Sequence, residues 1–369
     1  MEDLFSLSPA ALTYSDIVDE QTDLQPLKSF KYSGKDDSIL YEKFMSPFCE
    51  YLVENHVPHR LAPNAITLIG LICVIIPHVV LMSSYEAEGI VPHRICYLMS
   101  AVGTLLYTIL DNVDGKQARK RNQASPLGMI FDHGCDAFNT FLNGMVISRL
   151  FNISLNQQAV AVIAVSGLFY FATLEQYFTH YFYLPRINNV NEGVMLLVTV
   201  CLLGFLFGGG ITEAHLPLIG LSVSDFVFHL LTLGGVAIML NHYKTIVSKG
   251  TRLQTALIKA LPIYCLTLAL YLGVRTYHSR IDLYIFGFIF TKTTITLQVS
   301  HVLNKEFRPL RIDTMVVAVV WFISLVPPLR FLSQLALVLS VADCAVFAVV
   351  VSFRMARMLK INLLTYTEK

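Results

Sequence analysis

Long apolar segments alternate with short polar connections along most of the chain. About ten of them approach the roughly 20 apolar residues that a helix needs to cross a bilayer. The pattern predicts an all-α, polytopic membrane protein with about ten transmembrane helices. The expected spans are 64–83, 95–114, 127–149, 159–182, 193–209, 224–243, 255–274, 283–302, 313–330 and 332–353.

Residues 1–60 contain no such segment. Ser46 followed by Pro47 is a typical helix start, and Phe48 and Leu52 fall on one face of the helix that would follow. We interpret residues 46–56 as an amphipathic interfacial helix that lies on the membrane. A helix packed on a cytosolic loop is the alternative.

Lys and Arg residues concentrate in those connections that share a side with residues 1–60. Positively charged loops stay cytosolic, so both ends of the chain are predicted to be cytosolic, with an even number of spans. The chain then divides into a cytosolic arm (1–60), six spans (61–246), four further spans (247–353) and a basic cytosolic tail (354–369).

Composition agrees with a membrane protein. Hydrophobic residues make up 54% of the chain and charged residues 14%, against roughly 25% charged in soluble domains. The net charge of +1 gives no basic surface for nucleic acid, so no nucleic-acid partner is expected. The seven cysteines are scattered without metal-binding spacing.

Acidic residues cluster around the connection between the second and third spans. Asp111 and Asp114 are three residues apart, and Asp132 and Asp136 are four apart, so each pair shares a helix face. The short connection makes the two helices antiparallel neighbours, which predicts that the four carboxylates converge.

Four converging carboxylates repel one another unless cations bind between them. All-oxygen ligands favour Mg²⁺, Mn²⁺ or Ca²⁺ over zinc, and a cage of this size suits two ions. Arg119 is placed to bind phosphate, and Gly115 leaves room beside it. An ion pathway in a cation transporter and a purely structural charge network are the alternatives.

These residues fit the pattern D-x2-D-G-x2-A-R-x8-G-x3-D-x3-D over 111–136, which resembles the signature of the CDP-alcohol phosphotransferases. Pro63-Asn64-Ala-Ile-Thr67 resembles the entry to the first span in that family. Asp132-His133-Gly134-Cys135-Asp136 and Asn191-Glu192-Gly193 resemble its eukaryotic cholinephosphotransferase and ethanolaminephosphotransferase branch.

The resemblance implies roles for individual residues. Two Mg²⁺ or Mn²⁺ ions would be held by Asp111, Asp114, Asp132 and Asp136. Cytidine or its phosphates would contact Asn64, Gly115 and Arg119. His133 would accept a proton and Glu192 would orient it. Three alternatives stay open: His133 as a hydrogen-bond donor to a neighbouring Asp, Glu192 as a contact of the ammonium head group, and Asp136 as the base.

The resemblance also implies the reaction. Phosphocholine or phosphoethanolamine would pass from CDP-choline or CDP-ethanolamine to diacylglycerol, at the cytosolic face of the endoplasmic reticulum or Golgi membrane. Transfer to inositol or glycerol phosphate is the alternative.

Three further expectations concern the later part of the chain. Tyr170, Tyr177, Tyr181 and Tyr183 form either a cation–π wall for the head group or an ordinary interfacial aromatic belt. Spans 247–353 carry no acidic cluster in sequence and are expected to face lipid or to form a homodimer. Lys292 inside a span is expected to face a cavity or to pair, and Lys259, near a span end, to reach the interface.

Overall fold

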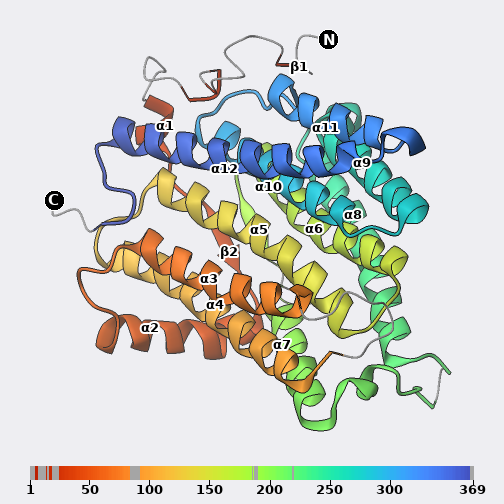
Figure 1. The fold of residues 1–369 in the computed structure, drawn as a ribbon. Helices are drawn as coiled ribbons and strands as arrows, with labels where there is room; N and C mark the ends of the chain where they lie inside the picture. Colours follow the sequence, from red (N-terminus) through yellow and green to blue (C-terminus); the bar gives the residue numbers. More distant parts are fainter. Residues whose placement is uncertain are drawn as a thin grey trace.

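The structure of the protein is a computed structural model. The described residues are 5–6, 14, 16–18, 25–83, 92–184, 186, 190–217 and 220–365. Long helices that run back and forth across the molecule dominate this part of the chain (Figure 1). They are α3 Pro63–Ser83, α4 Arg94–Lys120, α5 Pro126–Leu150, α6 Leu155–Thr179, α7 Val190–Phe207, α8 Val223–Ser248, α9 Leu253–Tyr277, α10 Ile281–Val302, α11 Ile312–Ser324 and α12 Leu332–Leu359.

Short elements connect and cover these helices. Strand β1 (Phe5–Ser6) pairs in parallel with β4 (Leu310–Arg311), and β2 (Gly34–Asp36) pairs in parallel with β3 (Phe182–Leu184). The remaining elements are α1 Gln25–Ser29, a π-helical turn at Tyr41–Met45, α2 Ser46–Asn55, and 3₁₀ turns at Gly209–Thr212 and Pro327–Leu329. Through the β2–β3 pair, the N-terminal arm reaches the end of α6.

The predicted all-α polytopic fold is confirmed. Among the described residues, seven helices are long and apolar enough to cross a membrane, namely α3, α4, α6, α7, α8, α9 and α12. Helix α11 is apolar but has 13 residues, fewer than a straight span requires. Ten spans therefore remain a prediction, although a helix begins or continues through each of the ten expected segments.

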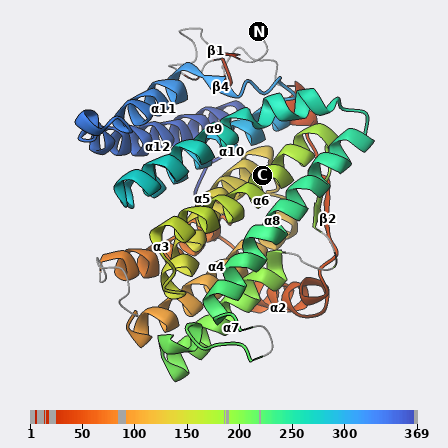
Figure 2. The same ribbon diagram turned by 90° about the vertical axis from the view of Figure 1, so that its right-hand side faces the viewer.

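Helix α5 lies at the junction of two groups of helices. On one side are α3 and α4, with α2 and α7 packed against α4; on the other are α9 to α12 (Figures 1 and 2). Helix α10 packs against α5, α6, α9 and α12, and almost all of its residues are buried. Side chains of α5 can therefore meet α4 on one face and α10 on another.

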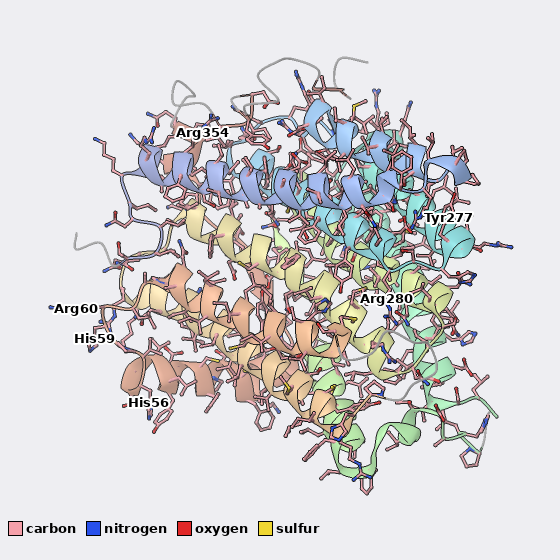
Figure 3. The ribbon with its side chains drawn as sticks, viewed as in Figure 1. His56, His59, Arg60, Tyr277, Arg280 and Arg354 are labelled. Atoms are coloured by element: carbon pink, nitrogen blue, oxygen red, sulfur yellow. The ribbon has the colours of Figure 1, made fainter. Side chains whose placement is uncertain are left out.

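The two ends of the helix bundle are marked by polar side chains. His56, His59 and Arg60 lie at one end, and Tyr277 and Arg280 lie toward the other (Figure 3). The first end also carries the connection between α4 and α5. The distribution of Lys and Arg predicts that this end faces the cytosol.

The helix predicted over residues 46–56 is confirmed as α2. Cys49 and Val53 are buried in a small core with Ile66 of α3 and Val113 of α4. The opposite face exposes Phe44 in the preceding turn, Phe48 and Tyr51. One face is thus fixed to the bundle, and the other exposes aromatic side chains beside Glu50 and Glu54. That this second face lies on the membrane stays a prediction.

Candidate active site

Three carboxylates meet between α4 and α5. Asp111, Asp132 and Asp136 each offer an oxygen, and these oxygens all lie within 4.8 Å of one another. The start of α5 is fixed locally: Ser125 caps the helix by accepting from the Gly128 N–H, and Pro126 occupies its first turn. The first three turns of α5 therefore present both of its carboxylates to α4.

The three carboxylates suit a hard divalent cation. Oδ1 of Asp111 and Oδ1 of Asp132 are buried and have no hydrogen-bond partner among the described residues. Buried oxygens of this kind are costly unless a cation or a donor satisfies them. An all-carboxylate set favours Mg²⁺, Mn²⁺ or Ca²⁺. The residues present therefore fit the metal that the sequence predicts.

Asp114 is held differently from the other three. It is 5% exposed, and its Oδ2 accepts a hydrogen bond from the Thr67 hydroxyl of α3. The structure thus brings three of the four predicted ligands into one close group and ties the fourth to the Pro63–Thr67 segment. A role for Asp114 at a second cation remains a prediction.

A tyrosine absent from the sequence-based predictions completes this group. Tyr107 of α4 donates a hydrogen bond from its hydroxyl to Asp136 Oδ1 at 2.7 Å. Tyr107 precedes Asp111 by four residues, so both lie on the same helix face. That spacing is the signal that would have identified it.

The predicted nucleotide contacts lie at the same end of the bundle. A Cβ atom on Gly115 would lie 3.3 Å from Nη1 of Arg119, so the guanidinium covers this glycine. A Cβ on Gly128 would lie 3.6 Å from Oδ1 of Asn64. The glycines therefore leave space beside the two side chains that the resemblance assigns to the nucleotide.

His133 follows Asp132 in sequence but faces another helix. Its ring is 6% exposed, and its Nδ1 lies 2.9 Å from Nε2 of Gln298 in α10. The ring centroid is 5.4 Å from that of Phe182 in β3 and 6.2 Å from that of Tyr32, which approaches edge-on. Gln298 was missed because no local motif marks it; a glutamine within an apolar span was the available signal.

Glu192 is fastened to the N-terminal arm. Its Oε1 accepts a hydrogen bond from the Ser38 hydroxyl at 2.7 Å, and the neighbouring Asn191 donates to Asp36 Oδ2 at 2.7 Å. Hydrogen bonds within the described residues thus connect Glu192 to Ser38 and His133 to Gln298, but not Glu192 to His133. Oε2 of Glu192 is buried and unpartnered there. Its predicted role as the residue that orients His133 stays a prediction.

Tyr32 lies over the site just before β2. Partial burial, and then the charges of Asp132 and Asp136, raise the pKa of its phenol, so that it stays protonated at neutral pH. A neutral phenol beside carboxylates is a hydrogen-bond donor. The arm of residues 25–60 therefore contributes an aromatic side chain beside His133.

The four tyrosines near the end of α6 do not form one wall. Tyr170 is fully buried and donates to the carbonyl of Lys259, and the Tyr177 hydroxyl accepts from the Phe307 N–H. Tyr181 and Tyr183 stack at 6.4 Å and are exposed. Only this stacked pair has the exposure that a head-group contact requires.

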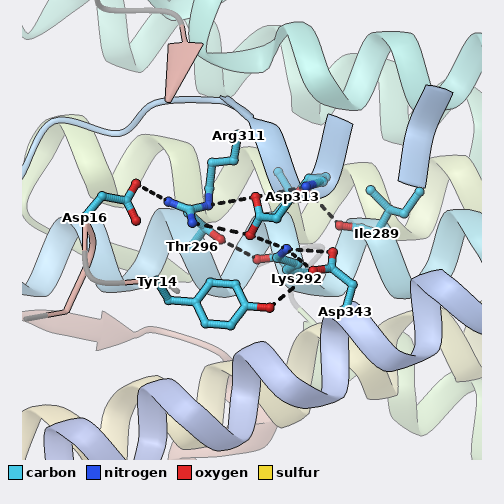
Figure 4. Close-up of polar contacts among 10 residues, drawn as sticks. Tyr14, Asp16, Ile289, Lys292, Thr296, Arg311, Asp313 and Asp343 are labelled. Atoms are coloured by element: carbon cyan, nitrogen blue, oxygen red, sulfur yellow. Dashed lines mark hydrogen bonds and ion pairs between the residues drawn. The ribbon is translucent and has the colours of Figure 1, made fainter. Parts of the chain in front are cut away.

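Spans 247–353, which carry no acidic cluster in sequence, hold a cluster of paired opposite charges in the structure. Asp313 of α11 and Asp343 of α12 converge on Lys292 of α10, at 2.7 Å and 2.6 Å (Figure 4). Arg311 pairs with Asp313 and with Asp16, and Tyr14 contacts Asp343. Lys292 was expected to pair, and it does. Separation along the chain, over three helices, hid its partners.

Lys259 departs from expectation. Instead of reaching the interface, it is 4% exposed and its Nζ contacts Glu306 Oε1 at 2.8 Å and the Phe307 carbonyl at 2.6 Å. This contact joins α9 to the segment that follows α10. The buried lysines Lys259 and Lys292 therefore hold helices and connecting segments of residues 247–353 together through ion pairs and hydrogen bonds.

The fold and the site together define a polytopic helical membrane protein with a buried carboxylate cluster near one end. Residues 60–218 match the family model described as CDP-alcohol phosphatidyltransferase. The chain is 31% identical over 229 residues to cholinephosphotransferase 1 of Gallus gallus, covering 62% of this chain and 68% of that protein. The chain belongs to the CDP-alcohol phosphatidyltransferase family.

Other relatives differ in their named substrates. Choline/ethanolaminephosphotransferase 1 of Saccharomyces cerevisiae is 33% identical over 218 residues, which cover 57% of this chain and 54% of that protein. A CDP-diacylglycerol–serine O-phosphatidyltransferase of Encephalitozoon cuniculi is 31% identical over 190 residues, with 51% and 49% covered. The aligned part spans about half the length of several relatives.

Proposed function

We propose that the chain transfers phosphocholine, phosphoethanolamine or both from the CDP-amino alcohol to diacylglycerol and releases CMP. The observation that carries the proposal is the group of three carboxylates on α4 and α5, which stands within the region that matches the family model. Two relatives whose names specify choline or ethanolamine transfer support the choice of head group.

In this proposal each residue has a defined task. Asp111, Asp132 and Asp136, with Asp114 beside them, hold two Mg²⁺ or Mn²⁺ ions. When bound, these ions neutralise the diphosphate and stabilise the leaving CMP. Asn64, Gly115 and Arg119 contact the nucleotide. The Arg119 guanidinium suits paired hydrogen bonds to phosphate oxygens.

His133 is the proposed proton acceptor. The diacylglycerol hydroxyl gives its proton to the imidazole while its oxygen forms a bond to the β-phosphorus. The bond from that phosphorus to the oxygen shared with the CMP phosphate breaks, and CMP leaves. A neutral imidazole is a better base near pH 7 than a carboxylate that binds a cation. Glu192 is proposed to orient His133, and Asp136 to hold the metal. The alternatives are Glu192 as a contact of the ammonium head group and Asp136 as the base.

The proposal extends to the route by which each substrate reaches the site and to the part that each region of the chain plays. Diacylglycerol reaches the site from the bilayer, and the soluble nucleotide from the cytosolic face of the endoplasmic reticulum or Golgi membrane. Residues 61–246 form the catalytic core. Residues 247–353 support it and are proposed to contribute a homodimer contact, and residues 354–369 form a basic cytosolic tail.

A direct assay tests the proposed function. Purified protein in vesicles that contain diacylglycerol is offered CDP-choline and CDP-ethanolamine in competition, and we expect labelled CMP and phosphatidylcholine or phosphatidylethanolamine to appear. CDP-diacylglycerol with serine, inositol or glycerol phosphate is supplied in parallel. Activity with that second set alone would reject the proposal and assign the chain to the other branch of the family.

Gln298→Met should lower kcat by about 10- to 100-fold and leave KM for the nucleotide nearly unchanged. The residue touches the His133 ring but none of the predicted nucleotide contacts. A ring that loses its buried partner no longer holds one tautomer and orientation. For His133 to accept a proton at Nε2, the Gln298 amide must turn so that its Oε1 accepts from Nδ1–H. Gln298→Glu accepts from Nδ1–H in the same way and should recover most of the rate. Equal losses in both variants would indicate that Gln298 serves packing alone.

A further inference from the structure

The segment that follows α12 turns back toward the site. Lys360 ends the helix in the left-handed conformation with φ of 55°, and the Ile361 N–H bonds to the Ala356 carbonyl at 3.0 Å. This is the pattern of a helix C-terminus that reverses the chain. Ile361 and Leu363 then pack on a core that includes Leu127 and Ile130 of α5. The segment is thus held beside the start of α5.

One hydrogen bond connects this segment to the predicted nucleotide site. Asn64 donates from Nδ2 to the Leu363 carbonyl at 2.9 Å. A carbonyl oxygen only accepts, so this contact fixes which end of the Asn64 amide faces the segment. The other end, Oδ1, is directed to the side of Gly128, where a Cβ would lie 3.6 Å away. Asn64 therefore presents an acceptor, and not a donor, toward the space beside Gly128.

We propose that residues 361–365 are a positioning segment that makes the enzyme selective for cytosine by orienting the Asn64 amide. This rests on the proposed function, in which Asn64 contacts the cytidine. Cytosine carries an amino group, a donor, at the ring position where uracil carries a carbonyl oxygen. An acceptor at Asn64 Oδ1 pairs with the first and repels the second. The Leu363 carbonyl prevents the amide from turning to suit uracil.

Two deletions test the segment. One variant ends at Lys360 and lacks residues 361–369, and its matched control ends at Thr365 and keeps the Leu363 carbonyl. We expect the shorter chain to lose about tenfold in its preference for the CDP-alcohol over the UDP-alcohol, with KM for the CDP-alcohol raised and kcat changed less. The control should keep the selectivity of the full chain. Unchanged selectivity in the shorter chain would overturn the proposal.

Substitution of Asn64 separates this proposal from the function on which it rests. In the full chain, Asn64→Asp places a carboxylate oxygen against the Leu363 carbonyl and should impair nucleotide binding. In the chain that ends at Lys360 that repulsion is gone, so Asn64→Asp should be less harmful there. If Asn64→Ala leaves KM for the nucleotide unchanged, the assignment of Asn64 to the nucleotide fails. If Asn64→Ala raises KM but the two deletions behave alike, only the role of the segment fails.

Discussion

Asp132→Asn should reduce CMP release on the order of 10³-fold or more and, without metal, make the protein more stable to heat. The rate of CMP release falls because the variant removes one negative charge from the three carboxylates that are proposed to hold the cation. Stability rises because three carboxylates within 4.8 Å repel one another when no cation lies between them. Relief of that repulsion should add about 1–3 kcal/mol to the free energy of unfolding.

Thermal unfolding in detergent with and without Mg²⁺ or Mn²⁺ measures both effects. A cation that binds the folded state should raise the melting temperature of the natural sequence and have little effect on Asp132→Asn. Asp225→Asn is a matched control, because Asp225 lies in the first turn of α8, where it accepts a hydrogen bond from the hydroxyl of the capping Ser222, far along the chain from the cluster. A variant that keeps full transfer activity, or that melts at a lower temperature without metal, would contradict the carboxylate site.

The central features of the site were predictable because they depend on helical periodicity. Spacings of three and four residues place Asp111 beside Asp114 and Asp132 beside Asp136 in any α-helix. The rotation of each helix about its own axis depends on packing, which the local sequence does not record. Rotation of α4 brings Asp114 to Thr67 of α3, and the close group therefore has three members instead of four.

Contacts between distant segments were not predictable in the same way. Gln298 is separated from His133 by 165 residues, and Leu363 from Asn64 by 299. Neither Gln298 nor Leu363 belongs to a recognisable motif. The parallel pair of β2 and β3 likewise joins short segments that show no strand pattern of their own. Such contacts arise from the tertiary arrangement of helices, so a sequence read element by element does not contain them.

Lys292→Met should lower the free energy of unfolding by about 3–5 kcal/mol, the range expected when one partner of a buried ion pair is removed. Lys292 is 1% exposed and is the cation that both Asp313 and Asp343 contact. Without it, Asp343 keeps only the Tyr14 hydroxyl among its described partners, whereas Asp313 keeps Arg311. The loss should appear as a lower melting temperature in detergent.

Two comparison variants separate the buried charge from the loss of a side chain. Lys292→Met combined with Asp343→Asn returns the cluster to its original net charge and should recover most of the lost stability. Lys35→Met removes a lysine that pairs with Asp37 but has a side chain 61% exposed, and should cost at most about 1 kcal/mol. If the double variant is as unstable as Lys292→Met alone, the packing of the lysine stem and not its charge holds α10 to α11 and α12. In that case the position of Gln298, six residues further along α10, would depend on apolar contacts, and its effect on His133 should not respond to the charge of this cluster.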